Sequence, residues 1–167
     1  DRCLVAAFDA AIDPLLILTK ADLAPADEVL AGYPGLGFPV ITTHRLPDRT
    51  LVFDGPLAQI LADKTTVLIG HSGVGKSTLV NALVPDADRA VGRVNEVTGR
   101  GRHTSTSAYG FPFSGGLLID TPGVRSFGLA HVDVDRVIHA FPDLEPGTKE
   151  CPRSCTHDEA DCALDDH

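Results

Sequence analysis

Residues 65–78 read TTVLIGHSGVGKST, and this stretch decides the fold. Its first six residues, apart from Gly70, are β-branched or apolar, which is typical of a strand, and residues 76–84 have the pattern of a helix. Between them, Gly70 to Ser77 fit the pattern G-x-x-x-x-G-K-[ST] of a phosphate-binding loop. The alternative is a glycine-rich turn with a chance lysine. The strand before the loop and the helix after it favour a nucleotide site.

Each part of this loop has a task in nucleotide chemistry. The glycines let the backbone turn tightly, so that its N–H groups converge on phosphate oxygens at the start of the helix. Lys76 reaches the β- and γ-phosphates, which makes it a candidate catalytic residue, and the Ser77 hydroxyl is a ligand for Mg²⁺. The predicted nucleotide contacts in the loop are Gly70, His71, Ser72, Gly73, Val74, Gly75, Lys76, Ser77 and Thr78.

A second motif, D-T-P-G at residues 120–123, lies 44 residues after Lys76 and ends an apolar run of strand length. Alone, D-x-x-G is a weak pattern that is common in turns. Downstream of a phosphate loop, Asp120 is expected to hold the Mg²⁺ shell and the N–H of Gly123 to meet the γ-phosphate.

Between these motifs, residues 99–107 read GRGRHTSTS. A nucleotide-dependent switch needs a threonine that contacts Mg²⁺ and the γ-phosphate, on a segment that is ordered by the triphosphate. Thr104 and Thr106 both meet this requirement, and a plain Ser/Thr-rich loop is the alternative reading.

The stretch LLILTKADLAP at 15–25 is the candidate reader of the base. The Asp22 carboxylate can accept hydrogen bonds from N1–H and the 2-amino group of guanine, a pair that adenine does not offer. Lys20 is expected to lie over the base, and Thr19 to bridge by its hydroxyl. After the next predicted strand, Thr42 or Thr43 can supply a backbone N–H to guanine O6. Read without the phosphate loop, T-K-x-D is only a turn.

Apolar strands alternate with helices, which predicts an α/β fold with a parallel sheet and helices on both faces. In such sheets, ligands bind beyond the carboxyl ends of the strands, and the base loop, the Thr42-Thr43 pair, the phosphate loop and D-T-P-G lie at the ends of predicted strands. The predicted helices are 2–12, 26–32, 56–62, 76–84 and 132–141, and the predicted strands are 15–19, 38–42, 65–70 and 115–120. The segment 43–54 gives no clear signal, and the Cys/His-rich end is expected to be irregular.

Composition bounds the class of protein. The 167 residues are 43% hydrophobic and carry a formal net charge of −9, which argues against a broad polyanion-binding face. A basic segment at 89–102 holds four arginines and one acid, so a local basic patch is still possible on an acidic domain. No apolar run approaches the roughly 18 residues of a membrane span. The chain starts at Asp1 and contains no Met, which suggests a fragment, and we expect a cytoplasmic protein without membrane contact.

Three of the four cysteines lie within twelve residues, in the pattern Cys151-x₃-Cys155-x-His157-x₄-Cys162. Three thiolates and one imidazole match a closed tetrahedral Zn²⁺ site, which is structural because no coordination position is left open. Free thiols in a disordered tail are the alternative, and His167 is a spare ligand. Cys3 stands apart and is expected to pack as a small apolar residue.

The order of the motifs is base loop, O6 loop, phosphate loop, switch and D-x-x-G, which is a rotation of the usual GTPase order. With GHSGVGKST, GRGRHTSTS, DTPGVRSFGL and the Cys/His cluster, the chain resembles the circularly permuted GTPases of the ribosome small subunit-dependent GTPase A (RsgA) family. The resemblance implies a P-loop GTPase-type fold at 1–144 and the start of a zinc-binding region at 145–167. An N-terminal OB-fold domain, the first GTPase strand and the final helices are expected to be absent from this chain.

The resemblance also implies functions for individual residues. Thr104 matches the switch threonine, with contact to Mg²⁺, and His103 before it is implied as the residue that positions the attacking water. Such a residue is needed because the apolar Val124 follows D-T-P-G, where Ras-like enzymes have a glutamine. Thr19 replaces the usual Asn, and Thr42-Thr43 replaces Ser-Ala. Both long gaps of the zinc pattern are one residue shorter than usual.

The family implies a Mg²⁺-dependent GTPase that binds GTP and GDP, carries one structural Zn²⁺, and acts with the small (30S) ribosomal subunit and its rRNA in late maturation. The sequence gives no sign of oligomeric state, and a monomer is expected. Two other functions remain open: another P-loop ATPase or small-molecule kinase, which Thr19 keeps in consideration, and a non-catalytic zinc-knuckle RNA-binding module.

Overall fold

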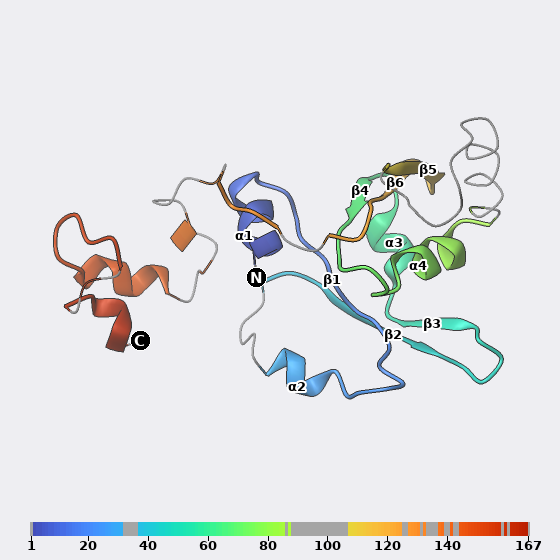
Figure 1. Ribbon diagram of the computed structural model, residues 1–167, viewed down its shortest axis with the longest axis horizontal. Helices are drawn as coiled ribbons and strands as arrows, with labels where there is room; N and C mark the ends of the chain where they lie inside the picture. Colours follow the sequence, from blue (N-terminus) through green and yellow to red (C-terminus); the bar gives the residue numbers. More distant parts are fainter. Residues whose placement is uncertain are drawn as a thin grey trace. The chain divides into compact units, whose positions relative to one another are not determined.

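The computed structural model describes residues 2–31, 37–85, 87, 107–124, 127–130, 132, 137–138, 141, 144–157, 159 and 161–166 (Figure 1). The chain divides into two compact units. The sheet unit comprises residues 16–32 and 40–126, and the second unit comprises residues 1–15, 33–39 and 127–167. Among the described residues, no helix has both the length and the apolarity that a bilayer crossing requires.

The first sheet of the sheet unit has three strands, β1 (Leu16–Leu18), β2 (Val40–Arg45) and β3 (Leu51–Asp54). β1 runs parallel to β2, and β3 runs antiparallel to it. Within β2, Ile41 and Thr43 are 3% and 1% exposed, so alternate side chains of this strand enter the core. The loop that carries Thr19 to Asp22 follows the carboxyl end of β1 directly.

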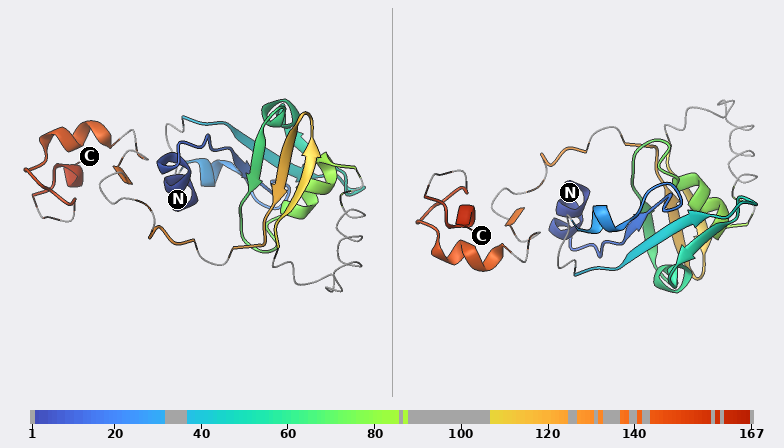
Figure 2. Two further views of the ribbon diagram at one scale, coloured as in Figure 1. Left: turned by 90° about the horizontal axis from the view of Figure 1, so that it is seen from above. Right: turned by 90° about the horizontal axis from the view of Figure 1, so that it is seen from below.

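The second sheet has the order β4 (Thr65–Leu68), β6 (Gly116–Asp120) and β5 (Tyr109–Phe113). Figure 2 shows these strands side by side in green, orange and yellow. β4 and β6 are parallel, and their register pairs Leu68 with Asp120. Because both strands end at the same level, the phosphate loop and the D-T-P-G segment start as neighbours.

Helices pack on these sheets through apolar side chains. α3 (Leu57–Leu61) buries Leu57 and Leu61, and α4 (Lys76–Leu83) buries Leu79 and Val80, while α2 (Asp27–Leu30) buries none. α4 contacts β6 of one sheet and β3 of the other. The helix that follows the phosphate loop therefore joins the two sheets.

The α/β class is confirmed, and the four predicted strands pair in parallel, β1 with β2 and β4 with β6. In the part of the chain that the structure describes they lie in two sheets and not one, and each sheet has an antiparallel strand, β3 or β5, that was not predicted. β3 lies in the segment 43–54 that gave no clear signal, and β5 contains Gly110 and Pro112, which are depleted in strands. Pro112 is tolerated because β5 is an edge strand of its sheet. Most of the helix predicted at 132–141 lies outside the described residues.

The second unit contains α1 (Arg2–Asp9) and two 3₁₀ helices, η2 (Glu145–Glu150) and η3 (Ala163–Asp166). α1 ends earlier than the predicted helix 2–12, and Ala11 beyond it has a φ of 52°. The rings of Phe8 and Phe38 lie 6.0 Å apart between centroids, and the Arg2 guanidinium donates to the Phe127 carbonyl at 3.4 Å. η2 precedes the Cys/His cluster in the chain and η3 follows it, and the two helices contact each other.

Truncating Leu118 to Ala is expected to lower the free energy of unfolding by about 2–5 kcal/mol, because it leaves a cavity in the centre of the second sheet. Leu118 is 1% exposed on the middle strand β6, with neighbours on both sides. Urea denaturation measures this loss. Val67→Ala on β4 is the control, because Val67 is 49% exposed and its truncation should cost about 1 kcal/mol or less. Equal losses at the two positions would contradict this placement of the core.

Candidate nucleotide-binding site and zinc cluster

The phosphate loop has the left-handed backbone conformation that its glycines predict at two positions. Gly73 and Gly75 have φ values of 76° and 117°, in the region that side chains disfavour. Gly75 is the N-cap of α4, and no side chain hydrogen-bonds the cap. The N-cap residue therefore leaves the first N–H groups of this eight-residue helix without a capping side chain, as suits an anion site.

Lys76 folds back over this loop. Its ammonium group donates to the carbonyl oxygens of Gly70 at 2.8 Å and His71 at 3.2 Å. These bonds hold the positive charge beside the backbone turn where the pattern predicts phosphate groups. Contact of Lys76 with the β- and γ-phosphates stays a prediction.

Asp120 and Ser77 lie together at the ends of β6 and the phosphate loop. The Ser77 hydroxyl donates to Oδ2 of Asp120 at 3.2 Å, while Oδ1 of Asp120 is buried and has no hydrogen-bond partner among the described residues. Burial raises the pKa of Asp120 above its ordinary value, against the Ser77 hydrogen bond and the Lys76 charge, which both lower it.

A buried carboxylate oxygen without a donor, next to a hydroxyl group, is a pair of hard oxygen ligands. Asp120 and Ser77 therefore fit the predicted Mg²⁺ site. When bound, the ion would neutralise charge on the phosphate groups and relieve the desolvated carboxylate.

The D-T-P-G segment packs directly on the phosphate loop. A Cβ added to Gly123 would come within 2.6 Å of the backbone N and Cα of Ser72, so only glycine fits here. The N–H of Val124 donates to the Gly70 carbonyl at 3.1 Å, and the Thr121 hydroxyl donates to the Leu68 carbonyl at 2.5 Å. The two motifs form one continuous surface of backbone.

The base loop, residues 19–22, is anchored on the same surface. The Thr19 hydroxyl donates to the Val74 carbonyl at 2.7 Å, and the Lys20 ammonium donates to the Gly73 carbonyl at 3.0 Å. A Cβ at Gly75 would lie 3.7 Å from the Thr19 side chain, which is ordinary contact. A single hydroxyl in place of the usual Asn amide is thus enough to join the two loops.

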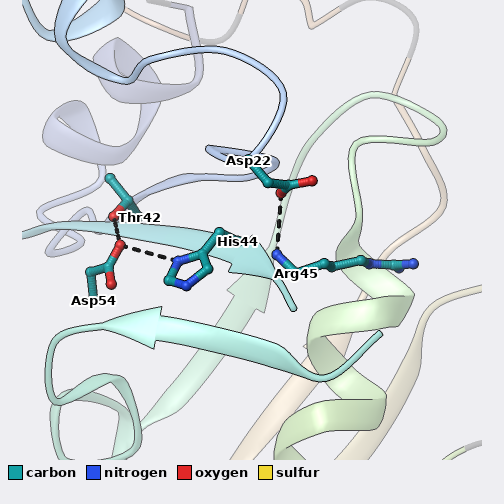
Figure 3. A network of polar contacts seen from close by, with 5 residues as sticks. All are labelled: Asp22, Thr42, His44, Arg45 and Asp54. Atoms are coloured by element: carbon teal, nitrogen blue, oxygen red, sulfur yellow. Dashed lines mark hydrogen bonds and ion pairs between the residues drawn. The ribbon is translucent and has the colours of Figure 1, made fainter. Parts of the chain in front are cut away.

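Asp22 follows on this loop and is exposed. Its Oδ1 accepts a hydrogen bond from the backbone N–H of Arg45 at 3.2 Å, as Figure 3 shows. The N–H of Ala21 donates to the Thr43 carbonyl at 3.0 Å, which ties the base loop to β2. The carboxylate therefore has a fixed backbone donor and an exposed position beside the phosphate loop.

The structure places Thr42 and Thr43 within β2, not in a loop after it. The Thr42 hydroxyl hydrogen-bonds Asp54, which also lies 3.6 Å from Nδ1 of His44 (Figure 3). Thr43 is 1% exposed. Their side chains are thus engaged within the fold, and contact of either backbone N–H with guanine O6 stays a prediction.

His103, Thr104 and Thr106 lie outside the described residues. The catalytic function predicted for His103 and Thr104, and the contact of Thr104 with Mg²⁺, therefore stay predictions.

The four predicted zinc ligands converge in the second unit. Their ligand atoms all lie within 4.8 Å of one another. Nδ1 of His157 is 3.7, 3.8 and 3.6 Å from the sulfur atoms of Cys151, Cys155 and Cys162. In a tetrahedral site with Zn–S bonds of about 2.3 Å, two sulfur ligands lie about 3.8 Å apart. The Cys151 and Cys162 sulfur atoms lie 3.9 Å apart, so the cluster fits Zn²⁺.

Glu159 supports this cluster and was not predicted from the sequence. Its carboxylate accepts from the Thr156 N–H at 3.1 and 3.0 Å and from the Cys155 thiol at 3.2 Å. With Cys155 protonated, its thiol, followed by the Thr156 backbone, lowers the pKa of Glu159 to about 2. When Cys155 binds Zn²⁺ as a thiolate, the Thr156 N–H remains as a donor to Glu159. An ionised Glu159 thus fixes the turn between Cys155 and His157. The only sequence signal for this contact was the position of Glu159, four residues after Cys155.

Together, the phosphate loop, the anchored base loop and the D-T-P-G segment define a P-loop nucleotide-binding protein with a rotated motif order. The fold is similar to a crystal structure described as that of YloQ, a circularly permuted GTPase, with a TM-score of 0.64 and 30% sequence identity over 99% of this chain and 53% of the YloQ chain. The model of the RsgA GTPase family matches residues 1–130. The chain belongs to this family of circularly permuted GTPases.

Curated relatives agree with this assignment. A protein of Pseudomonas aeruginosa named small ribosomal subunit biogenesis GTPase RsgA is 45% identical over 173 residues, which cover 98% of this chain and 50% of the relative. Its namesake in Pseudomonas syringae pv. tomato is 48% identical with the same coverage, and RsgA 1 of Vibrio vulnificus is 40% identical over 98% of this chain and 48% of the relative. The chain spans about half the length of these relatives.

Replacing Thr19 by Val should weaken GDP binding about fivefold, since it removes one hydrogen bond of about 1 kcal/mol and leaves the Val74 carbonyl without this donor. Calorimetric titration gives the dissociation constant. Thr19→Ser keeps the hydroxyl and should bind GDP like the unaltered protein. Equal affinity of the Val and unaltered proteins would show that the anchor is not needed.

Removing zinc with a chelator should make residues 145–167 more sensitive to protease, because the metal holds a segment too short to form its own core. Cys155→Ser should lower the metal content from one zinc per chain, as measured by mass spectrometry of the purified protein. Cys3→Ser is the matched control, since Cys3 is a free cysteine outside the cluster. Unchanged protease sensitivity after chelation would contradict the site.

Proposed function

We propose that this chain is the nucleotide-binding part of a cytoplasmic, monomeric ribosome biogenesis factor. It binds GTP and GDP with Mg²⁺, hydrolyses GTP, and acts in late maturation of the small (30S) ribosomal subunit. One observation carries the proposal: the hydrogen bonds of Thr19 and Lys20 to the carbonyls of Val74 and Gly73, which join the base loop to the phosphate loop.

Guanine is the base that suits Asp22. A carboxylate has only acceptor oxygens at neutral pH, and guanine presents two donors side by side, N1–H and the 2-amino group. Adenine has an unprotonated N1 and no amino group at C2, so it offers no such pair. The Arg45 N–H contacts Oδ1 of Asp22, which fixes the carboxylate without using all of its lone pairs.

Catalysis of GTP hydrolysis at the phosphate loop is electrostatic. Lys76 and the N–H groups at the start of α4 stabilise the charge that develops on the transferred phosphoryl group. Ser77, Asp120 and Thr104 would hold the Mg²⁺ ion, which would supply further positive charge there. His103 positions the attacking water because Val124 after D-T-P-G has no polar group for this task. Intrinsic turnover is slow without a glutamine at that position.

The partner follows from charge and from the relatives. The relatives' names connect those proteins to the small ribosomal subunit. In this chain the basic segment 89–102 lies between the phosphate loop and D-T-P-G, so contact with rRNA phosphates would act on the switch that the γ-phosphate orders. The net charge of −9 limits RNA affinity elsewhere on the chain. The structural Zn²⁺ held by Cys151, Cys155, His157 and Cys162 stabilises residues 145–167 for this contact.

Replacing Asp22 by Asn should reverse the base preference from guanine to xanthine. The amide replaces one acceptor by a donor, and xanthine has a carbonyl oxygen where guanine has its 2-amino group. Competition against fluorescent GDP by GDP, XDP and ADP measures the change, and we expect at least a tenfold loss for GDP relative to XDP.

The same competition separates the candidate functions. Unaltered protein that binds ADP as tightly as GDP would support an ATPase or kinase and end the GTPase proposal. Guanine preference that survives Asp22→Asn would instead mean that another residue reads the base. A protein that binds GDP but hydrolyses no GTP with small subunits present would favour a non-catalytic RNA-binding module.

A further inference from the structure

Arg45, the last residue of β2, contacts both ends of the nucleotide site. Its backbone N–H donates to Oδ1 of Asp22 at 3.2 Å. Its guanidinium Nη2 donates to the Thr78 hydroxyl at 3.0 Å, in the first turn of α4. Figure 3 shows the side chain extended from Asp22 toward this helix. The sequence patterns did not single out this residue.

The two contacts define where the guanidinium lies along a bound nucleotide. The base is placed by Asp22, and the β- and γ-phosphates by Lys76 and the loop before it. The ribose and the α-phosphate connect these parts covalently, so they must lie between them. The Arg45 backbone contacts Asp22, and its guanidinium group contacts Thr78, two residues beyond Lys76. The guanidinium group therefore lies beside the ribose and the α-phosphate.

The charge of Arg45 is not used elsewhere in the part of the chain that the structure describes. Its side chain is exposed and has no ion pair with a described carboxylate, and its one side-chain partner is a neutral hydroxyl. A guanidinium group has five donors in a planar fork that matches the oxygens of a phosphate group. After bonding Thr78, it keeps donors for an anion.

We propose that Arg45 binds the α-phosphate of the guanine nucleotide with its guanidinium group while its backbone N–H orients Asp22. This proposal rests on the proposed function and adds a residue that joins base recognition to phosphate recognition. If Arg45 binds the α-phosphate, its guanidinium group should increase the affinity only for ligands that carry a 5′-phosphate, and by the same factor whatever the base.

Arg45→Ala should therefore weaken GDP and GMP about tenfold, the effect expected for a hydrogen bond to a charged group. Guanosine, which has no phosphate, should keep the dissociation constant that it has with the unaltered protein, once the competition is corrected for the weaker binding of fluorescent GDP. The ratio of GDP to XDP affinity should also stay the same, because the backbone N–H on Asp22 is retained. Arg45→Lys should recover part of the loss through its charge.

The matched control is Arg49→Asn, which removes the same charge from the turn between β2 and β3. Asparagine tolerates the φ of 70° at this position, and this variant should bind GDP like the unaltered protein. Thermal unfolding without nucleotide should give the same Tm for Arg45→Ala and the unaltered protein.

Three results would overturn the assignment. Arg45→Ala that binds GDP normally would exclude a phosphate contact. Equal losses for guanosine and GDP would show that Arg45 only holds β2 against α4. Unaltered protein that binds no guanine nucleotide would remove the proposed function and the Arg45 assignment together, whereas normal GDP binding with an unaffected Arg45→Ala removes the assignment alone.

Discussion

The nucleotide site depends on two hydrogen bonds between loops that leave different sheets. The base loop follows β1 and the phosphate loop follows β4, and the Thr19 hydroxyl and Lys20 ammonium join them at the Val74 and Gly73 carbonyls. Each such bond contributes only about 1 kcal/mol to stability. Their importance is positional, because they set the distance from Asp22 to the phosphate-binding N–H groups.

The rest of the site follows from strand ends and close backbone packing. β4 and β6 end in register, so Asp120 meets Ser77, and Gly123 can lie on Ser72 because it has no Cβ. Neither contact depends on which strand comes first along the chain. This independence explains how a rotated motif order supports the same arrangement of loops: the loops meet at strand ends whose positions are set by pairing and by α4, which contacts both sheets.

The sequence predicted the residues whose task requires a fixed residue type at a fixed spacing. The phosphate loop, Asp120, Gly123 and the four zinc ligands are of this kind. β3 was missed because its four residues are too few to show a clear alternation, and β5 because Gly110 and Pro112 are depleted in strands. The pairing of both is decided by the strand beside them. Arg45 acts through one backbone and one side-chain contact that no sequence pattern encodes. Glu159 acts through contacts of its carboxylate with Cys155 and Thr156, and only its spacing from Cys155 could have indicated them. The contact that Thr19 makes could not be predicted from the sequence, because its hydroxyl reaches the Val74 carbonyl, which only the folded chain brings near.

The most direct test of a single site built from both loops is amide hydrogen exchange, read by mass spectrometry, during titration with GDP and Mg²⁺. Residues 19–23 and 70–78 should slow together and follow one binding curve, and ADP at the same concentrations should slow neither to the same degree. Slowing at 70–78 alone, with exchange at 19–23 unchanged at saturating GDP, would contradict the account, because the base loop would then take no part in binding the nucleotide.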